Sequence, residues 1–150
     1  MSILAWGKPL IEFTVSTAGA IPVAAVWAPM PASKLDTSKL TTTKGTKLEA
    51  TEEGGALIDS KSQANKYVFV TEIFVKKGDE RPIPDEDGVI DSNYGWRLTP
   101  EDDTLEGYIM ENASVSVEEN WTSKDGSSLI YTFDGLKPAA GKIVKPYTKA

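Results

Sequence analysis

Three aspartates in the middle of the chain lie close enough in sequence to suggest a calcium loop. They are Asp85, Asp87 and Asp91. Calcium loops combine carboxylates with a glycine at a sharp turn, and Gly88 lies within this group. With Gly88 at the sixth loop position, Ile83 falls at the first and Tyr94 at the twelfth, and neither is a suitable ligand. The pattern favours a solvated acidic loop, with an irregular divalent-cation site as the alternative.

Three other groups of residues with chemical potential are better explained by structure. Carboxylates at 101–103 and 106 resemble a glycosidase pair, but adjacent acids at a helix start are expected from the helix dipole. The run Glu53-Gly54-Gly55-Ala56 lacks the Lys-Ser/Thr of a phosphate loop and is interpreted as a pivot where a loop rejoins a strand. The four tryptophans fall in separate segments, so we expect core or interface positions in preference to a sugar-binding platform.

The composition argues against catalysis. Among the 150 residues there is no histidine and no cysteine. The common acid–base group, thiol nucleophiles and thiolate metal ligands are therefore unavailable. We predict a protein that is not an enzyme and has no cofactor or bound metal.

The charge distribution also limits the function. The net charge of the chain is −6, and residues 77–120 contain 13 acidic and 3 basic side chains. Such a segment repels phosphate, which argues against sequence-specific DNA binding. The N-terminus shows no basic start followed by an apolar run, and the apolar stretches are too short to span a bilayer. We expect neither ordinary secretion nor membrane embedding.

Period-two alternation dominates the chain and predicts strands. The expected strands are 10–15, 21–30, 66–76, 107–119, 129–133 and 142–144. Asp125-Gly126 predicts a type I′ hairpin between 110–120 and 128–134. Thr99-Pro100 predicts a helix of at most two turns, and 60–66 a single turn of helix.

The fold class predicted is all-β, an antiparallel β-sandwich or partly closed barrel in a single domain, residues 1–150. It has at most one short helix and two long loops, at 33–55 and 78–93. Both loops lack periodicity and exceed the usual length, so each is expected to have a function or to be disordered.

Five segments, read in chain order, form a distinctive layout. They are the opening at 6–13, a strand ending at Trp27, the Thr/Lys-rich stretch reaching 52–55, the strand at 65–72, and a closing hairpin around Asp125-Gly126 that ends in Tyr131-Thr132-Phe133. This layout resembles the tail tube proteins of long-tailed bacteriophages and the related tubes of contractile injection systems. The resemblance implies hexameric rings that stack into a tube for DNA, in a virion tail assembled in the bacterial cytoplasm. The implied partners are further copies of the chain and other tail proteins, with DNA passing without specific binding.

Three sets of residues are candidates for these roles. Contacts between rings are expected from Lys34, Lys39, Lys44, Gly45, Lys47, Glu52 and Glu53. Acidic residues facing the lumen or an exposed surface are Asp79, Glu80, Asp85, Glu86, Asp87, Asp91, Glu101, Asp102 and Asp103. Subunit-edge positions are Tyr67, Phe69, Ile73 and Phe74 on the most apolar strand.

Two alternative functions remain open at this stage. A β-sandwich binding module of carbohydrate-binding or adhesin type would use tryptophans and acidic loops at one end of the sandwich. Another phage head–tail or minor virion structural protein would share the fold and differ in ring stoichiometry.

Overall fold

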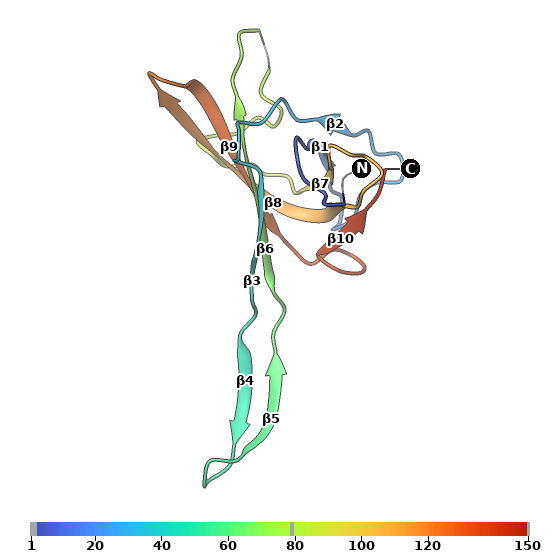
Figure 1. The fold of residues 1–150 in the computed structure, drawn as a ribbon, viewed down its shortest axis with the longest axis vertical. Helices are drawn as coiled ribbons and strands as arrows, with labels where there is room; N and C mark the ends of the chain where they lie inside the picture. Colours follow the sequence, from blue (N-terminus) through green and yellow to red (C-terminus); the bar gives the residue numbers. More distant parts are fainter. Residues whose placement is uncertain (1–2, 79, 150) are drawn as a thin grey trace.

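The computed structural model describes residues 3–78 and 80–149, and these residues form strands, turns and loops without a helix. The strands are β1 (Leu10–Val15), β2 (Ala28–Pro29), β3 (Lys39–Thr43), β4 (Lys47–Thr51), β5 (Leu57–Ser62), β6 (Lys66–Phe74), β7 (Tyr94–Thr99), β8 (Gly107–Thr122), β9 (Gly126–Gly135) and β10 (Val144–Tyr147). Eight form one antiparallel sheet in the order β2-β1-β7-β8-β9-β6-β3, with β10 also paired to β8 (Figure 1). The all-β antiparallel fold class is confirmed.

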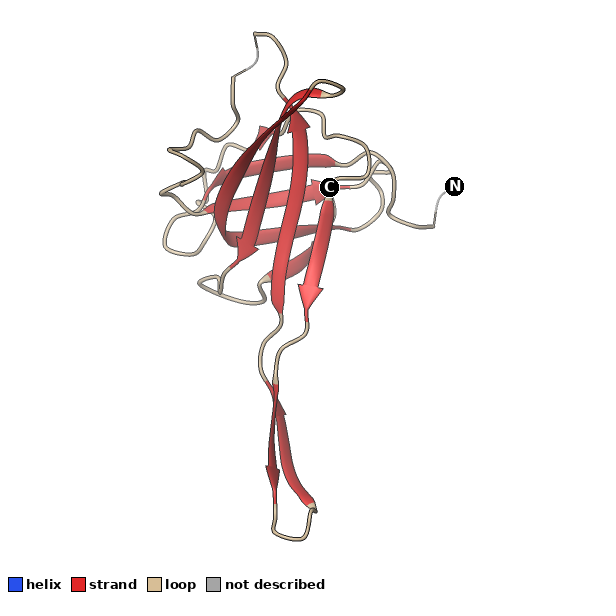
Figure 2. Ribbon diagram, turned by 90° about the vertical axis from the view of Figure 1, so that its left-hand side faces the viewer, coloured by secondary structure: helices blue, strands red, loops and turns tan. Residues whose placement is uncertain are grey.

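The long strand β8 belongs to both layers of the fold. Its first part pairs with β7 on one side and β10 on the other, and its second part, residues 113–122, pairs with β9. The β7–β8 register shifts between Tyr94 and Trp96, an irregularity of the kind that bends and twists a sheet. The sheet folds back on itself, and the strands of its two layers cross at a steep angle (Figure 2).

The core lies between these layers. Trp96 from β7 stacks on Phe69 from β6, with ring centroids 4.1 Å apart and planes 23° apart. Two strands separate β6 from β7 within the sheet, so this contact requires the sheet to fold over. Phe133 from β9 contacts both rings in tilted geometry, at 6.1 and 6.4 Å. Alternate residues of β6 and β9 also point into this core, because successive side chains of a strand lie on opposite faces of the sheet.

A buried tyrosine anchors the loop that follows β6. The Tyr131 hydroxyl donates a hydrogen bond to the Ile83 carbonyl at 3.0 Å and lies 3.4 Å from the Ile83 amide nitrogen, which donates to it. Both side chains are fully buried. Burial is the main cause of the raised pKa of Tyr131. Residues 80–93 contain isolated β-bridges and no strand, as expected for a loop. Near its start, at Ile83, this loop is hydrogen-bonded to the core.

Several predictions for the first half of the chain are wrong. Residues 33–55 are not one aperiodic loop, because they contain β3 and β4. Residues 60–66 form no helical turn: 60–62 end β5, 63–65 lie between strands, and Lys66 begins β6. Within 21–30 only Ala28–Pro29 forms a strand, since two prolines limit ladder pairing and the Ala25 amide bonds back to the Pro22 carbonyl in a turn.

The second half also differs in detail. The predicted helix at 99 is absent: Thr99 ends β7, and Asp102 organises a short turn by accepting hydrogen bonds from Thr104. The turn between β8 and β9 is not type I′. A type I′ turn requires a positive φ at both central residues, and here only Gly126 has one. Strand β7 went unpredicted, and β10 begins at Val144 and not at 142. No helix in the described part is long and apolar enough to cross a membrane.

Replacing Tyr131 by Phe should lower the free energy of unfolding by about 1–2 kcal/mol, because the backbone groups of Ile83 lose their buried partner. Urea denaturation of Tyr131→Phe measures the change. Tyr108→Phe is the matched control, since the Tyr108 side chain is 46% exposed. Equal stability of the two variants would show that the hydroxyl does not anchor the loop.

Candidate assembly surfaces

A two-stranded ribbon, called the arm here (residues 44–65), projects from the body of the protein (Figures 1 and 2). Its strands β4 and β5 pair only with each other, and every residue in both is exposed. The exposed side chains include Leu48, Leu57 and Ile58, at 52%, 55% and 67%. An isolated two-stranded hairpin is at best marginally stable in water. The arm therefore has the character of a surface that a partner covers.

The apolar side chains of the arm gather near its outer end. Ala50 pairs with Asp59 and shares a face with it, whereas Leu57 pairs with Thr51, nearer the outer turn. Leu48 lies on the same face as Ala50, two residues before it. A register shift between Ala50 and Thr51 leaves Ile58 as the additional residue on β5. The face of Leu48 and Ala50 also carries the charged Asp59 and Lys61, so exposed apolar and charged side chains lie side by side on the arm.

The neck of the arm consists of residues 44–46 and 63–65. Thr43 pairs with Lys66 on the body side of the neck, and Lys47 pairs with Ser62 on the arm side. The two pairs keep the same register, although the ladder is interrupted between them. The Asn65 side chain accepts a hydrogen bond from the Gly45 amide at 3.0 Å. A Cβ at residue 45 would overlap the Gln63 carbonyl, so only glycine allows the two backbones this close. Arm and body are consequently joined in fixed register.

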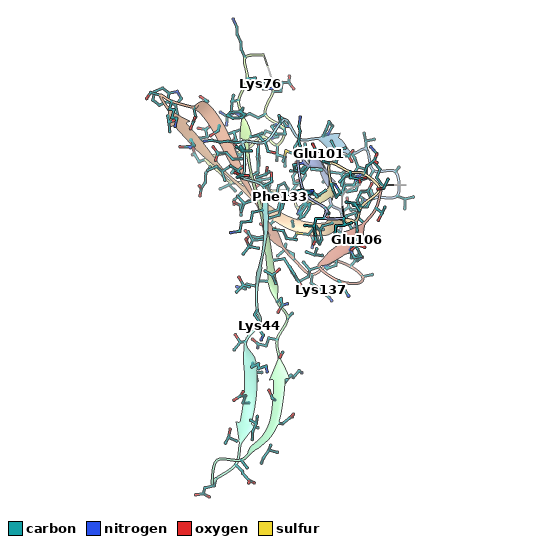
Figure 3. The ribbon with its side chains drawn as sticks, in the orientation of Figure 1. Lys44, Lys76, Glu101, Glu106, Phe133 and Lys137 are labelled. Carbon is teal, nitrogen blue, oxygen red and sulfur yellow. The ribbon has the colours of Figure 1, made fainter. Side chains whose placement is uncertain are left out.

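Six of the seven predicted inter-ring residues are distributed along the arm and the strand that leads into it. Lys39 lies on β3, Lys44 and Gly45 in the neck, and Lys47 on β4, with Lys44 labelled at the body end of the arm in Figure 3. Glu52 and Glu53 lie at the outer turn, where the Gly55 amide donates to the Glu52 carbonyl. Gly54 and Gly55, with φ of +103° and +93°, form this turn and are not the predicted pivot.

Lys34 lies apart from the arm. Its ammonium donates to Asp125 at 3.1 Å and to Glu72 at 3.5 Å, tying the segment before β3 to the β8–β9 turn. These partners raise the pKa of Lys34, the Asp125 hydrogen bond most strongly. Ser128 also donates to Glu72, at 2.7 Å. Lys34 is therefore committed to a contact within the chain.

The acidic candidates fall into two groups, and Asp79 lies outside the described residues. One group follows β6, at 80–91, and the other lies in the β7–β8 turn, at 101–103. Figure 3 shows Glu101 and Glu106 in the half of the body away from the β8–β9 turn. Hydrogen bonds from Thr104 lower the pKa of Asp102, the side-chain bond more than the backbone bond. The two groups do not form one acidic patch.

The first acidic group borders an open groove beside β8. Its walls are Arg81, Pro84, Asp85, Asp87, Gly88, Val117 and Glu119. Arg81 forms an ion pair with Glu119, and the Asp85 carboxylate accepts the Gly88 amide at 2.7 Å. Across residues 3–78 and 80–149, no group of three or more acidic side chains is arranged to hold a metal. The Asp85 carboxylate thus stabilises its own turn, and the Glu119 carboxylate pairs with Arg81.

Two of the predicted subunit-edge residues belong to the core. Phe69 and Ile73 are each 1% exposed, and β6 has β9 on one side and β3 on the other. The prediction is wrong for these two, because a strand paired on both sides has no free edge. Tyr67 packs against the core, and Phe74 is half-buried on the opposite face. For Tyr67 and Phe74, a role at a subunit edge stays a prediction.

The free edges of the sheet lie elsewhere. In the described chain, β2, β3 and β10 each pair with one strand only, and both edges of the arm are open. The outward face of β6 and β9 carries Val68, Val70 and Ile130, which are half-buried. Sequence reasoning located the apolar strand near 66–76 but could not assign which strand would lie at the edge of the sheet.

Comparisons with known proteins find likeness among solved structures, and it is distant. No protein-family model matches the sequence. No curated protein matches it either. Among solved structures, a similar one is the cryo-EM structure of the cap that terminates the tube of the anti-feeding prophage. The alignment covers 99% of this chain and 100% of that chain, at 13% identity and a TM-score of 0.47, a value too low to assign a shared fold.

Proposed function

We propose that the protein is a structural, non-enzymatic subunit that assembles with copies of itself into stacked rings forming a tail tube through which DNA passes. The arm is the observation that carries this proposal. Strands β4 and β5 expose all their side chains, including those of Leu48, Leu57 and Ile58, and have no partner strand beyond each other. A segment with these properties gains stability by docking on another chain.

The body supports contacts within a ring. Strand β3 offers a free edge, and pairing such edges in a closed ring removes the risk of uncontrolled aggregation. The half-buried apolar side chains on the outward face of β6 and β9 add area to such a contact.

The acidic residues suit a passage for DNA. Glu80, Glu86 and Asp91 are exposed, as are Glu101 and Asp103. Their number exceeds that of nearby bases, so a channel lined by either group would repel phosphate and let DNA slide. Sixfold repetition would add the fields of otherwise weak single charges.

The first test is the size of the purified protein. A tube subunit should form rings or longer polymers visible by negative-stain microscopy, with light scattering far above the 16.2 kDa chain mass. A monomer at every protein and salt concentration would refute self-assembly. A monomer that binds a carbohydrate would instead favour the binding-module alternative.

Removing the arm should abolish stacking without unfolding the body. Residues 47–62 are replaced by Asn-Gly, a two-residue turn that fits between Thr46 and Gln63, which already share a backbone hydrogen bond of 2.9 Å. Because the removed side chains are exposed, we expect the free energy of unfolding to change by about 0.5 kcal/mol or less. Deleting 38–46 would be unsuitable, since Leu40 packs against the core. Normal tube length without the arm would contradict its role.

Reversing exposed acids should make assembled protein retain DNA. The variant Glu80→Lys, Glu86→Lys and Asp91→Lys spares Asp85 and Asp87, because Asp85 supports the turn and Asp87 has a φ of +50°. We expect salt-dependent DNA retention in low-salt filter binding, where the wild type shows none. The matched variant Glu101→Lys, Asp103→Lys and Glu106→Lys tests the second acidic group. If both variants assemble and neither retains DNA, the acids do not line the passage.

A further inference from the structure

The charges on and beside the arm are sorted by sign. Between residues 39 and 66, the outer segment 49–59 contains every acid and no base, and the inner segments 39–48 and 60–66 contain every base and no acid. The outer acids are Glu49, Glu52, Glu53 and Asp59, and the inner bases are Lys39, Lys44, Lys47, Lys61 and Lys66. The arm thus has an acidic tip and a basic root of nearly equal and opposite charge.

These charges are not neutralised within the chain. Each charged residue of β4 and β5 faces an uncharged one: Lys47 pairs with Ser62, Glu49 with Ser60, Lys61 with Leu48, and Asp59 with Ala50. The ion pairs found among the described residues all lie in the body. All nine charged residues are exposed. A partner can therefore reach each of them.

The outermost acids of one arm, Glu52 and Glu53, are also too far from Lys44 and Lys66 to be attracted by them. Eight positions separate Glu52 from Lys44, which is about 26 Å along an extended strand at about 3.3 Å per residue. Screening in physiological salt acts over about 8 Å. Glu49 and Asp59 lie only two residues from Lys47 and Lys61, but neutralisation of the outermost charges must come from another molecule, and a surface of matching charge is present on the same chain.

We infer that the acidic tip of one arm binds the basic root of the arm of a second copy. This inference rests on the proposed self-assembly and names the two surfaces that meet. The contact joins two different patches, so each bound chain keeps a free tip or a free root, and assembly continues into rings or polymers. Leu48, at the boundary between basic and acidic segments, and Leu57 and Ile58, within the acidic segment, would lose water in the contact.

The test uses two charge-reversal variants at exposed positions. The tip variant carries Glu52→Lys and Glu53→Lys, and the root variant carries Lys44→Glu and Lys66→Glu. Alone, each places like charges at the contact, and we expect association at least tenfold weaker than wild type by light scattering at low salt. Mixed in equal amounts, the variants offer a basic tip to an acidic root and an acidic tip to a basic root. The mixture should recover assembly to within about threefold of wild type.

Matched controls change the net charge equally in the body. They are Glu101→Lys with Glu106→Lys, and Lys76→Glu with Lys77→Glu, and neither pair should weaken association by more than about twofold. Unchanged circular dichroism spectra establish that all variants fold.

Three results would overturn the inference: a root variant that assembles like wild type, a mixture that fails to recover, or a mixed complex that stops at two chains. In each of these the wild type still assembles, so the proposed function stands. A wild type that never assembles would instead refute the proposed function itself.

Discussion

The stacking of Trp96 on Phe69 is the contact on which the rest of the fold depends. The two rings come from strands that are not neighbours in the sheet, so the contact exists only when β8 bends and the two layers close. Closure buries Phe133, Tyr131 and Ile83 in the same core. Tyr131 then fixes the long loop through the Ile83 backbone. A large aromatic core of this kind supplies enough burial to hold structures that contribute little stability themselves.

The arm is the main structure that depends on this support. The β3–β6 ladder belongs to the closed sheet, and its register continues through the neck into β4 and β5. The body thereby sets the pairing of a ribbon that has no core of its own. Gly45 and Asn65 carry the register across the gap, because the first permits close backbone approach and the second replaces a missing ladder acceptor. A rigid body and a fully exposed arm are what a self-assembling subunit requires.

Electrostatics divides the molecule in a way that fits this proposal. Acids in the body are held in loops pinned to the core or capped by local hydrogen bonds, as with Asp85 and Asp102. The arm instead carries charges that nothing in the chain pairs. Charges are used locally in the body and are unpaired and sorted on the arm, which supports our proposal that the arm makes contacts between subunits.

Composition and local pattern determined the all-β class, the β8–β9 pair, β1, β6 and the loop before β7, because period two and turn residues are local signals. Six of the seven inter-ring candidates lie on or beside the arm, and their role stays a prediction. Composition and local pattern failed for β4 and β5, whose fully exposed residues show no buried face to create a pattern, and for β3, where only Leu40 is half-buried. They also failed for β7, where Gly95 and Arg97 obscure the pattern. Only the tertiary structure decided that Phe69 and Ile73 are core and not edge, since strand order comes from long-range pairing. Likewise, the sorting of arm charges into tip and root follows from a hairpin that brings residues 39–48 beside 60–66, a proximity that separation in sequence conceals.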